Sequence, residues 1–187
     1  EEPRLVTFRL AIPMPSKDQK MVLSTIQQMY IQLRVMGYHV ARLHTDLGGE
    51  FRGRSLTQWC RSRDIHRTTT AGVSSQSNGR AERAIQTVKG QIRRLLGMAG
   101  LPASRWPQAC HYVHERERRR MADKELNDVP PFGHELLVKR RFWKTKELEG
   151  THEVVKYLAP RPDAHGHLVL RQDGRTAIAP YFITKTK

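Results

Sequence analysis

The chain has few residues of the kinds that build disulfide frameworks or zinc modules. Its 187 residues include only two cysteines, Cys60 and Cys110, which are far apart and form no CxxC pair. This pattern excludes a Cys-rich zinc module and a disulfide framework, so we expect a reducing, intracellular compartment. The sequence also lacks an apolar run as long as a membrane span, and we therefore expect no membrane partner.

Acidic residues are scarce relative to basic ones. The 33 Lys and Arg against 18 Asp and Glu give a formal net charge of +15. Such a charge predicts a polyanionic partner, and nucleic acid is the commonest one. The alternative, a positive surface that only keeps the protein soluble, fits a net charge of a few units better than fifteen.

The first seventy residues alternate between strand-like and helix-like patterns. Apolar and polar residues alternate over 4–13, which predicts a strand closed by Pro13 and Pro15. Apolar residues at helical spacing predict a helix over 17–36, with Ser16 as N-cap and Gly37 as its stop. We expect a second strand over 38–46, a short helix from Ser55 that buries Leu56, Trp59 and Cys60, and a third strand over 64–70.

Small polar residues over 71–79 predict a mobile loop, and a long helix follows from Arg80 to about Leu96. Another helix is expected around Trp106, which the apolar pattern places in the core. We expect it to run into a solvated, charge-dense stretch from His114 to Glu125. Composition shifts near 127–133, after which short β-like runs dominate. A type I′ hairpin turn is expected at Asp173–Gly174. We therefore predict two domains, an α/β segment over 1–126 and a small basic β-rich module over 127–187.

Two acids stand out, Asp46 at the end of a predicted strand and Glu82 in the first turn of the long helix. Glu82, Gln86, Lys89 and Arg93 follow one another at spacings of four, three and four, which places them on a single helical stripe. Such a stripe can be a plain solvated face with i,i+4 pairing. It can equally be a metal ligand bordered by cations that bind phosphate.

The words around these two acids carry a family resemblance. "HTDLGGEF", followed after a gap by "SNGRAERA" with 35 residues between Asp46 and Glu82, resembles the integrase core of retroviruses and, more closely, of copia-type retrotransposons. The family signature is an Asp, a second Asp and, 35 residues later, a Glu on an RNase H-like fold. The resemblance runs from about residue 4 to 113, and it is weaker over the basic tail.

The resemblance implies an RNase H-like mixed sheet flanked by helices, in which Asp46 and Glu82 are catalytic residues and metal ligands. Two Mg²⁺ or Mn²⁺ ions would lie between three converging carboxylates in the intact parent. The first Asp of the triad has no counterpart in this chain, and we expect an N-terminally truncated fragment that lacks the first two strands and is inactive alone. Leu47 also departs from the family, which usually has Asn at that position.

The same resemblance, together with the basic residues, indicates where DNA would bind. Residues 76–79 would form a flexible loop beside the site, and Lys89 would contact the phosphate of a DNA end. "KRRFWKTK" over 139–146 interleaves bases with aromatics, as in strands that touch a phosphate backbone, although a basic edge strand guarded against aggregation has the same composition. "RERRR" over 116–120 is either a nucleic-acid patch or a solvated helix end. The expected DNA contacts are Gln76, Asn78, Lys89, Arg93, Lys139, Arg140 and Arg141.

The functional expectation is a part in DNA integration. The parent would process the ends of element cDNA and join them to target DNA, in the nucleus and as a homo-oligomer. The alternative is a non-catalytic remnant that only binds nucleic acid.

Overall fold

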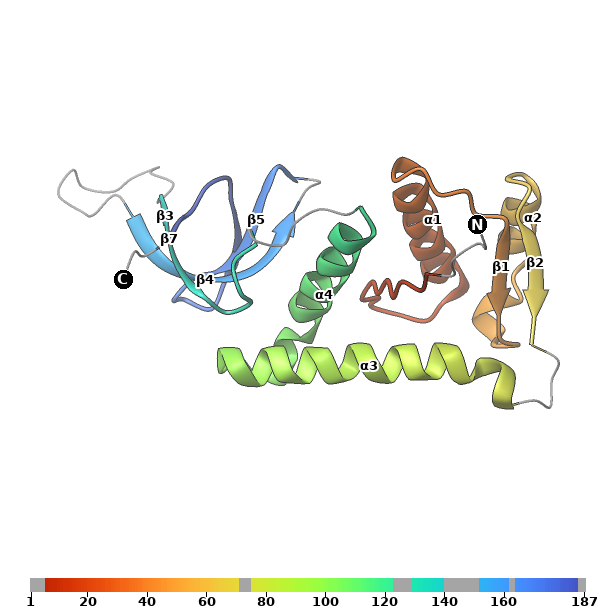
Figure 1. Ribbon diagram of the computed structural model, residues 1–187, viewed down its shortest axis with the longest axis horizontal. Coiled ribbons are helices and arrows are strands. Elements are labelled where there is room, and N and C mark those ends of the chain that lie inside the picture. Colours follow the sequence, from red (N-terminus) through yellow and green to blue (C-terminus); the bar gives the residue numbers. More distant parts are fainter. Residues whose placement is uncertain (1–5, 71–74, 123–128, 140–151, 162–163, 185–187) are drawn as a thin grey trace. The chain divides into compact units, whose positions relative to one another are not determined.

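The computed structural model describes residues 6–70, 75–122, 129–139, 152–161 and 164–184 (Figure 1). They form a mixed α/β structure, which confirms the predicted class. The chain packs as two compact units: unit 1 comprises Glu1–Ala11 with Val88–Lys187, and unit 2 comprises Ile12–Thr87. The proposed domain boundary near residue 127 remains a prediction. None of the helices in the described ranges is long and apolar enough to cross a bilayer.

Unit 2 is built on a parallel pair of strands, β1 and β2. Thr45 lies opposite Thr69 at the end of this ladder. Parallel neighbours require a crossover connection, and the chain between these strands supplies it with two helical segments. The elements are α1 (Gln19–Val35), β1 (Arg42–Thr45), η1 (Gly49–Phe51), α2 (Arg54–Arg61) and β2 (His66–Thr69).

The core of unit 2 forms where α2 meets the strands. Leu56 and Cys60 of α2 are buried with Ile65, as the apolar pattern predicted for the first two. Trp59 is partly buried in the same cluster and meets the Tyr30 ring edge to face, with centroids 5.3 Å apart. Aromatic pairs favour this geometry.

Helix α1 begins two residues later than predicted, because Asp18 rather than Ser16 is its N-cap. The Asp18 carboxylate accepts a hydrogen bond from the Met21 N–H at 2.8 Å. The Ser16 hydroxyl instead donates to Asp18, and these bonds lower the pKa of the Asp18 carboxyl. The helix ends as predicted at Gly37, which has a φ of +85°.

Unit 1 combines the C-terminal half of α3 (Ser75–Ala99) and α4 (Trp106–Met121) with an antiparallel sheet of order β6-β5-β4-β3-β7. A short 3-10 turn, η2 (Ala103–Arg105), joins the two helices. The predicted β-like runs correspond to the strands of this sheet. Their bounds are β3 Glu135–Lys139, β4 His152–Arg161, β5 Gly166–Leu170, β6 Thr176–Ala179 and β7 Ile183–Thr184.

One hydrophobic core joins these helices to the sheet. It contains side chains from one face of α3, from the middle of α4 and from four strands of the sheet. Its largest fully enclosed side chains are those of Leu136, Tyr157 and Leu158. The other buried members include Val88, Ile92, Leu96, Ala109, Tyr112, Val113, Val155 and Val169.

The dipeptide Phe132–Gly133 fastens the sheet to the end of α3. Phe132 is buried against Tyr112, with ring centroids 5.6 Å apart. The Gly133 N–H donates to the Tyr157 carbonyl at 2.7 Å. Gly133 has a φ of +78°, and a Cβ there would lie 2.3 Å from the Cβ of Ala99. Both the backbone conformation and the close approach therefore require glycine.

The N-terminal segment is not the predicted strand. Residues 6–13 carry neither helix nor strand. Their backbone groups bond instead to side chains of α4: the Arg9 N–H donates to Glu117 at 2.7 Å, and the Ala11 N–H donates to His114 Nδ1 at 3.3 Å. The alternation in the sequence reflects a segment laid on a helix, and no neighbouring strand pairs with it among the described residues.

Two smaller predictions also fail for physical reasons. Trp106 is 44% exposed at the start of α4 rather than in the core. The turn after β5 is not type I′, which needs a positive φ at both Asp173 and Gly174; only Gly174 has one, at +80°. The Gly174 N–H donates to the Arg171 carbonyl at 3.0 Å, and Arg171 donates to Arg175, as in a type I turn followed by a glycine bulge.

We predict that Gly133→Ala lowers the free energy of unfolding of unit 1 by about 2 kcal/mol or more, because strain and a clash with Ala99 add. Gly174→Ala is the matched control, since its φ is similar but nothing lies within 4 Å of its added Cβ. It should cost only about 1–2 kcal/mol. Urea denaturation followed by circular dichroism measures both, and equal losses would contradict the close contact.

We predict that the stability of unit 1 falls in mild acid through His114. Burial lowers the pKa of this imidazole. The nearby Glu115 carboxylate raises the pKa, whereas the charges of His111 and Arg118 lower it further. The folded pKa therefore lies below the unfolded value of about 6.5. The contribution is complete above that value and is lost as the pH falls through the folded pKa.

Urea midpoints between about pH 5 and 7.5 measure this effect, and His114→Asn should reduce the slope by up to about 1.4 kcal/mol per pH unit. His167, whose pKa burial also lowers, accounts for a remaining slope. An unchanged slope in the variant would show that His114 is not the titrating group.

Candidate active site around Asp46

Asp46 follows β1 directly, at the carboxyl end of the parallel pair. The Thr70 N–H donates to the Thr45 carbonyl at 3.0 Å, which extends the ladder to the residue before Asp46. The carboxylate is half-buried, and its Oδ1 accepts the Gly48 N–H at 3.1 Å. Ligands of α/β sheets bind at this edge, outside the carboxyl ends of the strands. The position suits a functional carboxylate.

The loop after Asp46 is held by donors from three parts of unit 2. Gln19 of α1 donates to the Gly49 carbonyl at 3.0 Å, and Arg52 donates to the Leu47 carbonyl at 2.9 Å. Arg67 of β2 donates to the Phe51 carbonyl and to Thr57 Oγ1, the latter at 2.6 Å. These bonds give side-chain donors to the carbonyls of the loop, and they hold the backbone on which Asp46 depends.

A second carboxylate, missed by the sequence reasoning, lies beside Asp46. Glu50 Oε2 and Asp46 Oδ1 lie 2.7 and 3.0 Å from the point where a Cβ on Gly48 would stand. A side chain at position 48 would therefore displace these carboxylates. The signal available in the sequence was the Gly-Gly pair between two acids.

Glu82 lies on α3 and is exposed. It belongs to unit 2, as Asp46 does. Among the described residues no bond joins the two carboxylates directly, and their pairing across a metal remains a prediction.

The predicted loop at 71–79 is wrong for residues 75–79, because α3 begins at Ser75. Gln76 and Asn78 are therefore helical, although their side chains, like residues 71–74, lie outside the described part of the structure. Once the strong helix formers from Arg80 onward adopt a helix, adding residues to its end needs no new nucleus. The polar composition of this segment concealed the extension.

The remaining predicted DNA contacts fall on two elements. Lys89 and Arg93 are exposed on α3, as the stripe predicts. Lys139 is exposed at the end of β3, whereas Arg140 and Arg141 lie outside the described residues. Their contact with DNA remains a prediction.

The described residues only partly fit a divalent metal centre. Carboxylate oxygens such as those of Asp46 and Glu50 are the donors that Mg²⁺ prefers. Yet no group of three or more His, Cys, Asp or Glu side chains within the described ranges is arranged to hold an ion. The donor chemistry fits a divalent ion, but the number of ligands does not.

Sequence comparison identifies a relative. No family model matches the chain. It is 30% identical over 151 residues to the retrovirus-related Pol polyprotein from transposon TNT 1-94 of Nicotiana tabacum. The chain is a relative of a transposon Pol polyprotein. This confirms the predicted relationship, although the aligned part is 80% of this chain and only 10% of that polyprotein.

Two solved structures resemble the present chain. The catalytic core domain of BIV integrase is 24% identical, with a TM-score of 0.38 over 63% of this chain and 65% of that one. A simian T-cell lymphotropic virus intasome in complex with PP2A regulatory subunit B56 gamma is 14% identical, with a TM-score of 0.42 over 91% and 65% of the two chains. Both structural similarities are weak. The relationship therefore rests on the sequence match to the transposon Pol polyprotein.

We predict that Arg67→Met lowers the free energy of unfolding of unit 2 by about 1–3 kcal/mol, because the Phe51 carbonyl and Thr57 lose their donor. Arg63→Met, at an exposed position of the same unit, should change stability by less than about 0.5 kcal/mol. Urea denaturation of both variants measures the difference. Similar losses would mean that Arg67 does not support the loop.

Proposed function

We propose that this chain is part of the integrase region of a retrotransposon Pol polyprotein and that it acts in DNA integration by binding DNA. In the full-length parent, Asp46 and Glu82 would be two carboxylates of an RNase H-like active site that processes 3′ ends and transfers strands with Mg²⁺ or Mn²⁺. Element cDNA ends and target DNA would be its substrates. The parent would act as a homo-oligomer in the nucleus.

The observation that carries this proposal is the position of Asp46. It stands at the carboxyl end of a parallel strand, and 35 residues separate it from an exposed glutamate on a long helix, in a sequence related to a transposon Pol polyprotein. Divalent ions in such sites clamp the attacking and leaving oxygens of a phosphodiester. The net charge of +15 supports a polyanionic substrate.

The alternative is a non-catalytic unit that binds nucleic acid through its basic residues. The observation that favours it is the lack of a three-ligand group within the described ranges. Metal binding separates the two candidates, since only the first requires it.

We predict that Mg²⁺ or Mn²⁺ raises the melting temperature of the chain and that Asp46→Asn and Glu82→Gln each reduce this rise. An ion at a hundredfold excess over its Kd stabilises the folded state by about 2.7 kcal/mol. Differential scanning fluorimetry with and without metal measures the shift. Binding of duplex DNA, measured by anisotropy at several salt concentrations, should persist in both variants, since phosphate contacts do not need these acids.

Asp64→Asn is the matched control, because it removes an exposed carboxylate from the same unit and Asn tolerates the left-handed φ of 55° at that position. The control should keep the full metal shift. Steep, salt-dependent DNA binding without any metal shift in the unmodified chain would favour the non-catalytic alternative.

A further inference from the structure

Unit 1 contains a pocket of about 390 Å³ between α3, α4 and the N-terminal segment. None of the carboxylates proposed as metal ligands lines it. Its volume falls in the range of small-molecule sites.

Four arginines and one glutamate give the lining of this pocket a net charge of +3. Arg9 comes from the N-terminal segment, Arg94 from α3, and Arg116 and Arg120 from α4 together with Glu117. A concave surface with this excess of guanidinium groups attracts anions. Guanidinium donors match the oxygens of phosphate in pairs.

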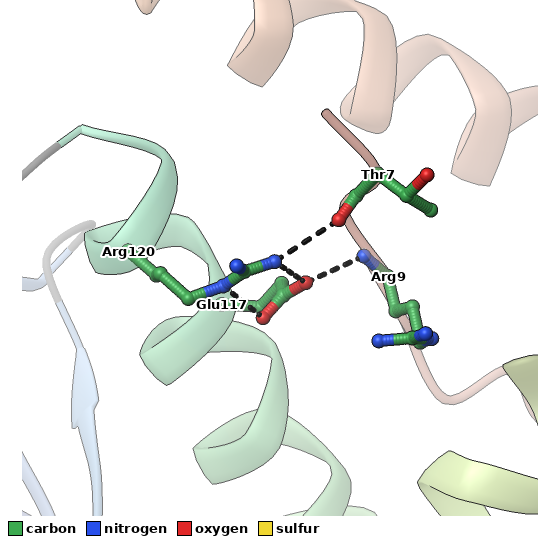
Figure 2. Close-up of polar contacts among 4 residues, drawn as sticks. All are labelled: Thr7, Arg9, Glu117 and Arg120. Atoms are coloured by element: carbon green, nitrogen blue, oxygen red, sulfur yellow. Dashed lines mark hydrogen bonds and ion pairs between the residues drawn. The ribbon is translucent and has the colours of Figure 1, made fainter. Parts of the chain in front are cut away.

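Glu117 does not cancel this charge, because it is committed to one arginine. Its carboxylate pairs with Arg120 at 2.9 Å and accepts the Arg9 N–H at 2.7 Å (Figure 2). Arg120 also donates to the Thr7 carbonyl at 3.0 Å. Burial raises the pKa of Glu117, but the bonds from Arg120 and Arg9 outweigh it and hold the pKa below its usual value. The pair is thus internally neutral.

Three guanidinium groups remain for a ligand. Glu117 accepts the backbone N–H of Arg9, and no bond is drawn from the Arg9 guanidinium (Figure 2). The Arg116 guanidinium lies 5.9 Å from the centre of the Tyr112 ring, a cation–π contact, and it also hydrogen-bonds the Tyr112 hydroxyl. A guanidinium has five N–H donors, so one such bond leaves others for a ligand. Within the described residues the structure records no carboxylate in ion-pair distance of Arg94 or Arg116.

The rest of the lining is apolar. Leu95 and Met98 of α3 face Tyr112 and Val113 of α4 in the same pocket. Met98 is 87% exposed, so its side chain is accessible to a ligand from solvent. A ligand that fills the pocket must therefore present an anion to the arginines and a flat or apolar group to this wall.

We propose that this pocket binds one nucleotide unit, with its phosphate on Arg94 and Arg116 and its base against Met98 and Leu95. A nucleotide combines the two required features, whereas inorganic phosphate has only the first. The unit comes either from a single-stranded DNA or from a free nucleotide, and the chemistry is the same. The site needs no metal and no catalysis, so it is independent of the function proposed for Asp46 and Glu82.

The test uses the full chain in EDTA, which removes any contribution from metal. Binding of dTMP and of inorganic phosphate is measured by titration calorimetry, and binding of a labelled twelve-nucleotide oligo(dT) by fluorescence anisotropy. The double variant Arg94→Gln/Arg116→Gln should weaken nucleotide or oligonucleotide binding by about tenfold or more. Arg175→Gln is the control, since its side chain is 86% exposed in the same unit and lies outside the pocket.

A second variant keeps the test independent of folding. Met98→Ala changes an exposed side chain, so it should leave stability unchanged and weaken nucleotide binding several-fold while leaving inorganic phosphate unaffected.

The binding measurements either support the nucleotide site or overturn it. Pocket-dependent binding of dTMP supports the site with a free nucleotide, and pocket-dependent binding of oligo(dT) alone supports it with a strand. Equal losses in Arg175→Gln and in the double variant would overturn the site, because only general charge would then matter. Inorganic phosphate that binds as tightly as dTMP, or a Met98→Ala variant that binds dTMP normally, would overturn the role of the apolar wall.

Discussion

The burial of one face of α3 fixes the rotation of this helix about its axis. That rotation decides which way the proposed DNA-binding side chains of the helix point. Val88, Ile92 and Leu96 are held in the core of unit 1. Since successive residues of an α-helix are turned by about 100°, Lys89 and Arg93 follow on a different face and stay exposed. The exposure of the proposed DNA-binding residues therefore depends on core packing in which none of them takes part.

The elements that the sequence predicted best are those whose pattern is set by burial within one helix or one strand. The helix that buries Leu56 and Cys60 satisfies its hydrogen bonds locally. The strands at Asp46 and in the tail show their period plainly, although their partner strands lie farther along the chain. Segment 6–13 could not be predicted in this way. Its backbone is satisfied by Glu117 and His114, more than a hundred residues away, and no local pattern reveals such partners.

The candidate site shows the same division between local and distant information. The family words around Asp46 and Glu82 predict that both acids matter, and the structure places Asp46 at a strand end and Glu82 on an exposed helix surface. Glu50 was missed because its approach to Asp46 depends on the tight turn at Gly48. The helical start at Ser75 was missed because composition alone does not report how far a helix extends.

The arginine-rich stretch of α4 shows why net charge overstates what is available to a polyanion. In the sequence, residues 116–120 fit either a nucleic-acid patch or a solvated helix end. In the structure Arg118 pairs with Glu115 at 2.8 Å and Arg120 with Glu117 at 2.9 Å. A phosphate would have to displace these carboxylates before it could bind either arginine. Replacing one surface ion pair by another changes the free energy little. Arg116, held over an aromatic ring, carries no such cost. The salt dependence of nucleic-acid binding should therefore follow the few cations without internal carboxylate partners, such as those of the pocket, rather than the total of +15.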